Sequence, residues 1–521
     1  MILGTGAPSF GAPNLVKQTS DHMTFLLSID NGLTVSKAVL FDANGKAVAT
    51  SRRRVEKLLP APHFVERNMD CLWLETATAI KEVLEISGVA SESVAAVAVT
   101  AHGDGLYLVD KELRPLRSGI LSLDSRCAAI IDKWNMDGTS DKSLLLTGQT
   151  PHASAPSALL AWIRDFEPSI YNRIYKVLAA KDWLRFCLTG TLGTDLTEAS
   201  TSFTNVETQA YADDILEIFG LEALGSALPR VSGPCEIVGH VHFDAAKITG
   251  LKEGTPVVAG LHDVTASALG IGGYAQGCVA IVAGTYSINE TLTTRPKTDP
   301  AWFCRNGISL GEWNNMAISP ASAANYDWFL DKLMPLERGK RGNEIHTTIA
   351  QDIAQIGTSN ILFHPYLFGS PYGAFASASF LGMRGWHGRS EILRAVIEGI
   401  AFNHRIHIEA LRSTFDVKSA RLTGGISRNP VFCQIFADAL GLPIEVTDVD
   451  EAAAWGAALC AGTGVKLFDC PEQGPKNFEL TTYQPECSQK SDMDDLFALY
   501  LEASNALTPI WKKLEERGNA R

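Results

Sequence analysis

The stretch CVAIVAGTYS, residues Cys278–Ser287, decides the fold. Its first six residues form a short apolar run, and glycine and hydroxyl residues follow at once, as expected where a buried strand ends in a turn. A similar arrangement opens the chain, where the apolar run Phe25–Ile29 precedes a loop with Gly32 and Thr34 and then the run Lys37–Phe41. Each half is therefore predicted to open with a strand, a glycine-containing loop and a second strand, which indicates an approximate duplication.

Strand-like apolar runs alternate with amphipathic helical stretches along the whole chain, which is the pattern of an α/β protein. The glycine-rich stretch Gly270–Gly273 lies between the two halves. We therefore predict an N-terminal lobe over residues 23–270, a C-terminal lobe over residues 271–521 and a cleft between them. Residues 1–22 are rich in Gly, Pro, Ser and Thr and are expected to form a disordered extension.

Composition restricts the class of protein. The chain has 521 residues, of which 46% are hydrophobic, and 45 Lys and Arg stand against 58 Asp and Glu, giving a net charge of −13. This balance disfavours nucleic acid or an anionic membrane surface as a partner. The ten cysteines are scattered without a C-x-x-C pair, as in reduced cytoplasmic proteins. No apolar run approaches the ~18–20 residues that span a bilayer, so a cytoplasmic protein is expected.

The loop after the first strand has the composition of a phosphate-binding turn. Glycine lets a backbone approach closely, hydroxyls and N–H groups can bind phosphate oxygens, and a lysine adds positive charge. The residues predicted for this role are Gly32, Thr34, Ser36 and Lys37, with Asp30 at the strand end holding Mg²⁺ through water. An ordinary hairpin turn is the alternative. The matching Gly284-Thr285 loop favours the first interpretation, because two such loops across a cleft would clamp a phosphate.

A third element, Leu422–Pro430, predicts a nucleotide site. A strand ends at Gly424 and Gly425, and a helix begins near Pro430 just after Asn429. Ligands of open α/β sheets lie beyond the carboxyl ends of strands, and glycines there leave room for a base or ribose. A tight strand-to-helix turn without a ligand is the alternative.

Asp263 is the predicted catalytic base. It follows a buried strand candidate and precedes a helix of small residues, so its carboxylate would enter the cleft near the phosphate clamp. Helix capping is the alternative role. Polar residues near other strand ends of the first half are predicted to bind a polyhydroxy substrate, although each alone is more often a surface or capping residue: His102, Gly103, Asp104 and Asp124.

Two motifs point elsewhere and are disfavoured. Gly307–Gly311 matches the G-x-S-x-G elbow of serine hydrolases around Ser309, but the residues after it are a poor helix opening. Gly270–Ala275 matches G-x-G-x-x-A but follows a helical stretch rather than a strand, so a dinucleotide site is not expected. His404 and His407 lie on a predicted helix without a carboxylate at metal-ligand spacing, and we expect ordinary core or surface histidines.

Several segments together resemble the FGGY family of carbohydrate kinases, within the actin, hexokinase and Hsp70 superfamily. The resemblance covers about residues 25–464, and its motifs keep the family's order. The segments that carry it are Lys181–Leu184 with Leu188–Gly190 and Thr194-Asp195, Ala378–Met383 with Glu391-Ile392 and Ala395–Glu398, Thr423–Gly425 with Ser427, Gln434, Ala437 and Asp438, and Glu451 with Gly456–Ala458.

The resemblance implies a two-lobed, ribonuclease H-like α/β fold and transfer of the γ-phosphate of ATP, with Mg²⁺, to a sugar or polyol hydroxyl, with Asp263 as base. Leu33 and Val35 replace two hydroxyl residues of the family's first loop, and Val264 stands where an amide residue often follows the base.

The chain looks most similar to the branch of erythritol kinases and L-xylulose kinases, and we expect erythritol as substrate, with L-xylulose or another ketopentose as the alternative. A nucleotide-switch ATPase is a distant alternative, and a homodimer is left open.

Overall fold

The first lobe is built on a seven-stranded sheet whose central strands are the predicted opening hairpin and its neighbour. The computed structural model describes residues 24–519 except 343, 374 and 477, so the expected extension 1–22 lies outside the described residues. The strand order is β11-β12-β5-β1-β2-β3, with β13 beside β5, and β1 runs antiparallel to β2 but parallel to β5. The bounds are β1 Phe25–Asn31, β2 Val35–Asp42, β3 Ala47–Arg54, β5 Val94–Ala101, β11 Ile237–His240, β12 Pro256–Val258 and β13 Leu261–His262.

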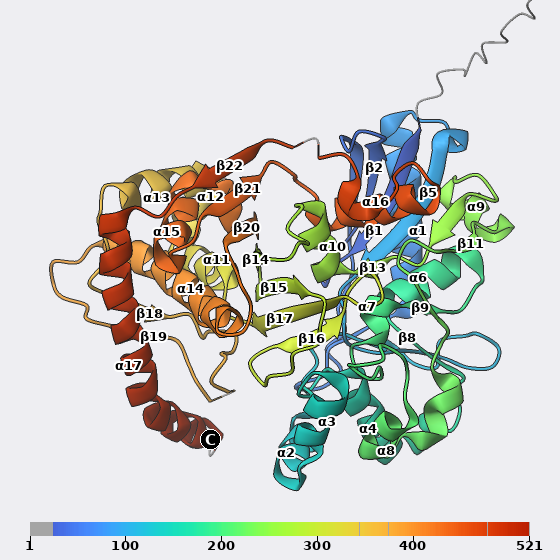
Figure 1. The fold of residues 1–521 in the computed structure, drawn as a ribbon, viewed down its shortest axis with the longest axis horizontal. Coiled ribbons are helices and arrows are strands. Elements are labelled where there is room, and N and C mark those ends of the chain that lie inside the picture. The colour runs from blue at the N-terminus through green and yellow to red at the C-terminus, as the bar shows by residue number, and fades with distance from the viewer. Residues whose placement is uncertain (1–23, 343, 374, 477, 520–521) are drawn as a thin grey trace, which may run out of the picture.

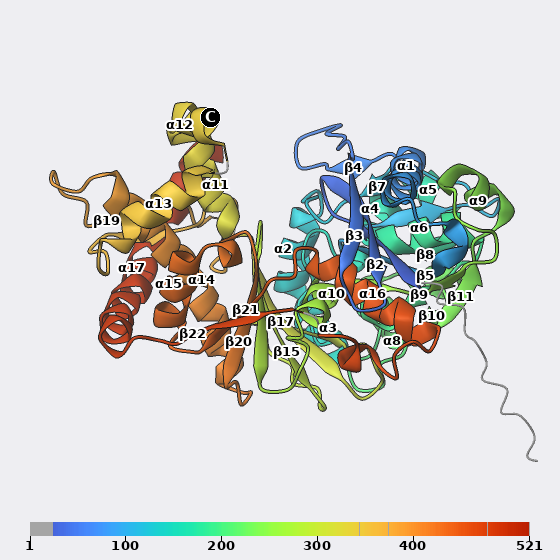
Figure 2. The same ribbon diagram turned by 90° about the horizontal axis from the view of Figure 1, so that it is seen from above.

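The second lobe repeats this arrangement, as the duplication predicted. Its sheet has the order β16-β17-β15-β14-β20-β21-β22, and β14 is antiparallel to β15 but parallel to β20. The sheet lies beside helices α11 to α15 and α17 (Figures 1 and 2). The bounds are β14 Cys278–Ala283, β15 Ser287–Thr293, β16 Phe303–Asn306, β17 Trp313–Ser319, β20 Ser419–Gly424, β21 Ile444–Thr447, β22 Leu480–Tyr483, α11 Ala323–Leu333, α12 Pro335–Arg341, α13 Glu344–Ala354, α14 Arg389–Arg412, α15 Pro430–Leu440 and α17 Cys487–Asn519.

The remaining elements cover the first sheet and extend that lobe around the cleft. Helix α1 packs on β2 and β3, and α2, α3, α4 and α8 form a small helical group at the far end (Figure 1). Their bounds are α1 Met69–Ser87, α2 Ala128–Asp137, α3 Thr139–Thr147, α4 Pro156–Phe166, α5 Pro168–Tyr171, α6 Ala180–Thr189, α7 Leu196–Ala199, α8 Asp213–Phe219 and α9 Phe243–Thr249, with short strands β4 Glu66–Arg67, β6 Tyr107–Val109, β7 Gly119–Ile120, β8 Lys176–Leu178, β9 Thr194–Asp195, β10 Val231–Ser232, β18 Leu362–His364 and β19 Ser379–Leu381.

Strand β1 is buried on both faces, and its side chains alternate between two cores. Phe25, Leu27 and Ile29 pack with residues of α1, whereas Leu26 packs with residues of α10 (Asp263–Gly270) and α16 (Ala452–Gly464). Helix α16 therefore belongs to the C-terminal half of the sequence but covers the N-terminal sheet, as Figures 1 and 2 both show.

Helices α10 and α16 touch backbone to backbone. A Cβ added to Gly456 would lie 2.7 Å from the carbonyl carbon of Ala266, and one added to Gly270 would lie 2.8 Å from the carbonyl carbon of Ala452. Both distances are well inside the usual ~3.5–4.0 Å between carbon atoms, so only glycine permits this approach. Because α10 begins at Asp263, the crossing determines where the predicted base lies.

The disfavoured motifs have ordinary structural roles. Ser309 lies in the turn between the antiparallel strands β16 and β17, without the strand–turn–helix of a hydrolase elbow. His404 and His407 are buried in α14 and contact Ser322 and Ser319, as expected for core histidines.

Candidate active site

A cleft of about 620 Å³ lies between the lobes, and both predicted loops reach it. The first lobe contributes Leu33 and Thr34, and the second contributes Thr285 and Tyr286. The structure thus brings together at one cleft seven of the residues singled out from the sequence: Thr34, His102, Gly103, Asp104, Asp124, Asp263 and Thr285.

Asp263 is the first residue of α10, and its side chain is 27% exposed at the cleft. Burial raises the pKa of this carboxyl well above its usual range, and the nearby acidic side chains of Asp30 and Glu290 raise it further. A carboxylate in such a setting binds a proton more readily than one in water. The geometry therefore fits a group that accepts a proton inside the cleft.

The residue before Asp263 is closely packed. A Cβ on Gly103 would overlap the imidazole ring of His262, so Gly103 makes room for that ring. Burial, with Arg305 nearby, lowers the pKa of His262 to about 3, and the ring is therefore neutral.

Asp104 is held by two residues that the sequence did not point to. Its Oδ1 lies 3.0 Å from Nη2 of Arg305 and 3.5 Å from Nε2 of His152. Although burial opposes it, these two neighbours hold the pKa of Asp104 well below its usual range. Asp104 also has a left-handed backbone, with φ 56°, which is uncommon for residues other than glycine. The carboxylate is therefore ionised and fixed at the cleft wall.

His102 and Asp124 line the same wall but are largely committed to the protein. Burial, with Arg67 nearby, lowers the pKa of His102 to about 3, so its ring stays neutral. Asp124 accepts hydrogen bonds from the backbone N–H of Val65 and from Arg126, which occupies both of its carboxylate oxygens. Asp124 thus orders the cleft wall through contacts that the sequence did not reveal.

The first loop differs from the phosphate-binding turn predicted above, because two of its residues already have protein partners. Nζ of Lys37 lies 3.1 Å from Oδ2 of Asp30 and 2.9 Å from Oε2 of Glu451, at the N-terminus of α16, so its charge is already paired. Ser36 is fully buried, and its hydroxyl bonds Thr76 on α1 rather than facing the cleft. Thr34 is the exposed hydroxyl of this loop, and Gly32 closes its turn by donating to Val35.

Two of the three glycines predicted to bind the nucleotide in the second lobe leave open space. Nothing lies within 4 Å of a Cβ built on Gly284 or Gly425, whereas Gly424 has φ +98° and stands close against Ala283. Gly424 is thus required by the turn, and Gly425 leaves room beside it. Asn429 caps α15 by accepting from the N–H of Val431, so its side chain has a structural partner.

Comparison with known proteins identifies the family. The N-terminal domain of the FGGY family of carbohydrate kinases matches residues 25–270, and the C-terminal domain matches residues 279–465. This chain belongs to the FGGY family of carbohydrate kinases. It is therefore a phosphotransferase acting on a sugar or polyol hydroxyl, and the nucleotide-switch and hydrolase alternatives fall away. The family implies ATP as phosphate donor and a small carbohydrate as acceptor.

Individual relatives refine the picture. The chain is 35% identical over 498 residues to the L-xylulose/3-keto-L-gulonate kinase of Escherichia coli, covering 94% of this chain and 99% of that one. It is 34% identical to a probable L-xylulose kinase of Pasteurella multocida, covering 85% and 91%, and 27% identical to the erythritol kinase of Brucella abortus, covering 94% and 97%. Erythritol kinase is thus a more distant relative than these two, and the expectation of erythritol loses support.

Solved structures confirm the two-lobed fold. The ligand-bound xylulose kinase of Lactobacillus acidophilus superposes with a TM-score of 0.87 at 23% identity, covering 94% of this chain and 100% of that one. The glycerol kinase of Plasmodium falciparum gives 0.80 at 19% identity, covering 92% and 98%. Among the helices of residues 24–519 that the structure describes, none is long and apolar enough to cross a membrane.

Proposed function

We propose that this kinase phosphorylates a small ketose held in the cleft, with Asp263 as general base. The observation that carries the proposal is the position of Asp263, whose carboxylate enters the same cleft as the exposed hydroxyls of Thr34 and Thr285. Its raised pKa makes its ionised form a stronger base than a carboxylate in water.

In this mechanism, Asp263 accepts the proton of the substrate hydroxyl as that oxygen bonds to the γ-phosphorus of ATP. The bond from the γ-phosphorus to the β–γ bridging oxygen breaks, and ADP leaves. Thr34 and Thr285 donate hydrogen bonds to the phosphoryl oxygens from opposite lobes. The open space at Gly425 accommodates the nucleoside.

Asp30 would hold Mg²⁺ through water. It is a buried carboxylate near the end of β1. Lys37 contacts its Oδ2 and not its Oδ1. One carboxylate, with water and substrate phosphates, is a donor set that Mg²⁺ commonly uses. When bound, the ion would supply positive charge that offsets the negative charge of the ATP phosphates.

Ketopentoses such as L-xylulose are proposed over erythritol. The relatives at 34–35% identity carry L-xylulose in their names, whereas the erythritol kinase is 27% identical. The cleft lining also includes Arg305, whose Nε and Nη2 bond Gln149 and Asp104 and whose Nη1 can donate a hydrogen bond to a carbonyl oxygen. A tetritol has no carbonyl, and a buried polar group without its partner costs affinity.

A screen of ADP release over three- to six-carbon ketoses and polyols tests the proposal. We expect kcat/KM for L-xylulose to exceed that for erythritol by at least ~10-fold, equivalent to about 1.4 kcal/mol. A preference for erythritol would overturn the ketose assignment and leave the kinase assignment standing. Asp263→Asn should lower kcat by ~10²–10⁴ with ATP still bound, and a kcat close to that of the wild type would refute the base assignment.

A further inference from the structure

We propose that Thr197 is a positioning residue for Asp263, acting through the backbone amide of His262; this inference rests on the proposed role of Asp263 as base. Thr197 is 3% exposed and lies on α7, outside the residues that line the cleft. The backbone N–H of His262 donates to Oγ1 of Thr197 at 2.9 Å. Thr197 therefore holds the peptide that immediately precedes Asp263.

A buried relay fixes Thr197 itself. Its hydroxyl and its backbone N–H both donate to Oδ2 of Asp195, at 2.7 and 2.8 Å. Oδ1 of Asp195 lies 2.8 Å from Nζ of Lys181, and both of these residues have 0% exposed side chains. Because its proton is committed to Asp195, the Thr197 hydroxyl presents a lone pair to His262 and accepts from it.

The same ion cluster holds the other end of this segment. Lys181 and Arg185, both on α6, donate to the carbonyl oxygen of Ala259 at 3.4 and 3.3 Å. The five residues from Ala259 to Asp263 are thus held at the first carbonyl and at the last amide before the base. The second residue of this segment is equally constrained, because a Cβ on Gly260 would overlap the backbone of Val99.

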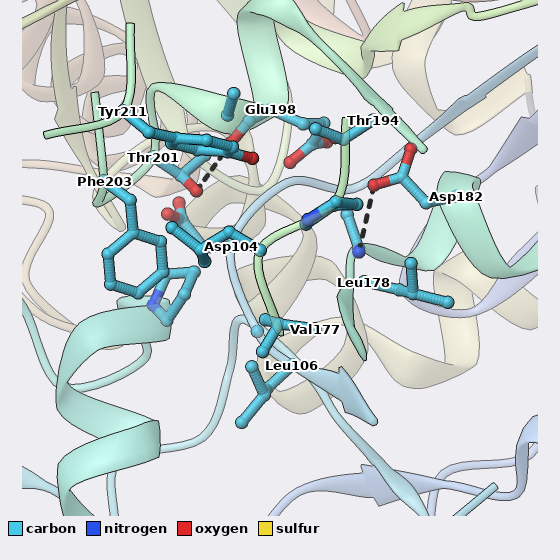
Figure 3. A pocket seen from close by; sticks show the side chains of 16 residues that line it. Asp104, Leu106, Val177, Leu178, Asp182, Thr194, Glu198, Thr201, Phe203 and Tyr211 are labelled. Atoms are coloured by element: carbon cyan, nitrogen blue, oxygen red, sulfur yellow. Dashed lines mark hydrogen bonds between the residues drawn. The ribbon is translucent and has the colours of Figure 1, made fainter. Parts of the chain in front are cut away.

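Stability alone does not account for such a cluster. Buried ion pairs pay a desolvation penalty that often matches their attraction, so apolar residues would serve packing as well. Asp104, which lines the cleft, also lines a small cavity of about 40 Å³, and Figure 3 shows Asp104 on one side of it and Asp182 on the other. Asp182 lies 2.7 Å from Nζ of Lys181, so the ion cluster that holds the segment before Asp263 also reaches the cavity beside Asp104.

Steady-state kinetics of Thr197→Val test the proposal. Valine has nearly the same shape but accepts no hydrogen bond, so the His262 amide loses its acceptor. We expect kcat to fall by at least tenfold, toward the ~10²-fold that a 1 Å misplacement can cause, while the KM values for ATP and sugar stay unchanged. Thr197→Ser, which restores the hydroxyl, should recover most of kcat.

Thr249→Val is the matched control. Thr249 is fully buried in the same lobe, and its hydroxyl likewise donates to a backbone carbonyl and accepts from a backbone amide, but neither Thr249 nor its partners Ala245 and Leu251 line the cleft. This control should retain kcat. If Thr197→Val and Thr249→Val have equal kcat values, or if serine fails to restore activity, the positioning role is refuted.

Two further variants complete the design. Should Thr197→Val fail to fold, Thr197→Cys carries the same test, because its thiol fills the site but accepts hydrogen bonds weakly. Asp263→Asn separates the two proposals. Full activity in that variant refutes the base and the inference built on it, whereas an inactive Asp263→Asn with a fully active Thr197→Val refutes the positioning role alone.

Discussion

Replacing Gly456 with alanine tests whether the crossing of α10 and α16 sets the geometry of the site. Helix propensity alone predicts that this change stabilises the protein by about 0.8–1 kcal/mol, because Gly456 is inside a helix. The added Cβ, however, would stand 2.7 Å from a carbonyl carbon of Ala266, about 1 Å too close. Backbone atoms cannot rotate away, so the two helices must separate. Overpacking of this kind costs about 1–3 kcal/mol or more, and we expect net destabilisation.

Gly339→Ala is the matched control, since Gly339 is exposed inside α12 and nothing lies within 4 Å of its Cβ. Urea unfolding should show a lower free energy of unfolding for Gly456→Ala and an unchanged or higher one for Gly339→Ala. Because α10 begins at Asp263, Gly456→Ala should also lower kcat. Gly270→Ala makes the reciprocal contact, so the double variant should cost less than the sum of the single ones. A Gly456→Ala protein as stable and active as Gly339→Ala would refute the reasoning.

Three other perturbations follow from the site. Gly425→Leu should raise KM for ATP far more than KM for the sugar. The backbone angles of Gly425 tolerate leucine, and the new side chain would fill the open space proposed for the nucleoside. Equal increases in the two KM values, measured by ADP release, would argue for a purely structural turn. Asp104→Asn should lower the free energy of unfolding by about 3–5 kcal/mol, because the buried Arg305, 3% exposed, would keep its positive charge without a carboxylate partner. An unchanged midpoint in denaturant unfolding would contradict this. Burial raises the pKa of Glu290 to about 8 from 4.5, so the folded protein keeps this proton while the unfolded chain releases it, and stability is lost as pH rises from 4.5 to 8. The stability of Glu290→Gln relative to wild type should therefore rise through that window, and a constant difference in thermal midpoint would contradict the assignment.

Patterns within a short stretch of sequence predicted much of the fold. The two opening hairpins, the strand before Gly424 and the helix after it follow from apolar runs that end in glycine and polar residues. Such runs also bring Thr34 and Thr285 to one cleft, because equivalent strand ends of duplicated lobes face each other. That α16 covers the first sheet could not be predicted, because its own residues do not indicate which of the two sheets it packs against.

The pairing of charges could not be predicted, because the partners are far apart in sequence. Lys37 binds Glu451 across 414 residues, and Arg305 binds Asp104 across 201. A lysine beside a glycine loop resembles a phosphate ligand until its carboxylate partners are known.

Those partners give the lysine a different role. Glu451 stands at the start of α16, and Asp263 stands at the start of α10, the helix that α16 crosses. Lys37 therefore ties the proposed phosphate loop to one of these helices, while the other carries Asp263, the proposed base. If the two helices separate at the crossing, the loop moves with α16 and Asp263 moves with α10, so the distance between the loop and Asp263 depends on this contact between the two helices.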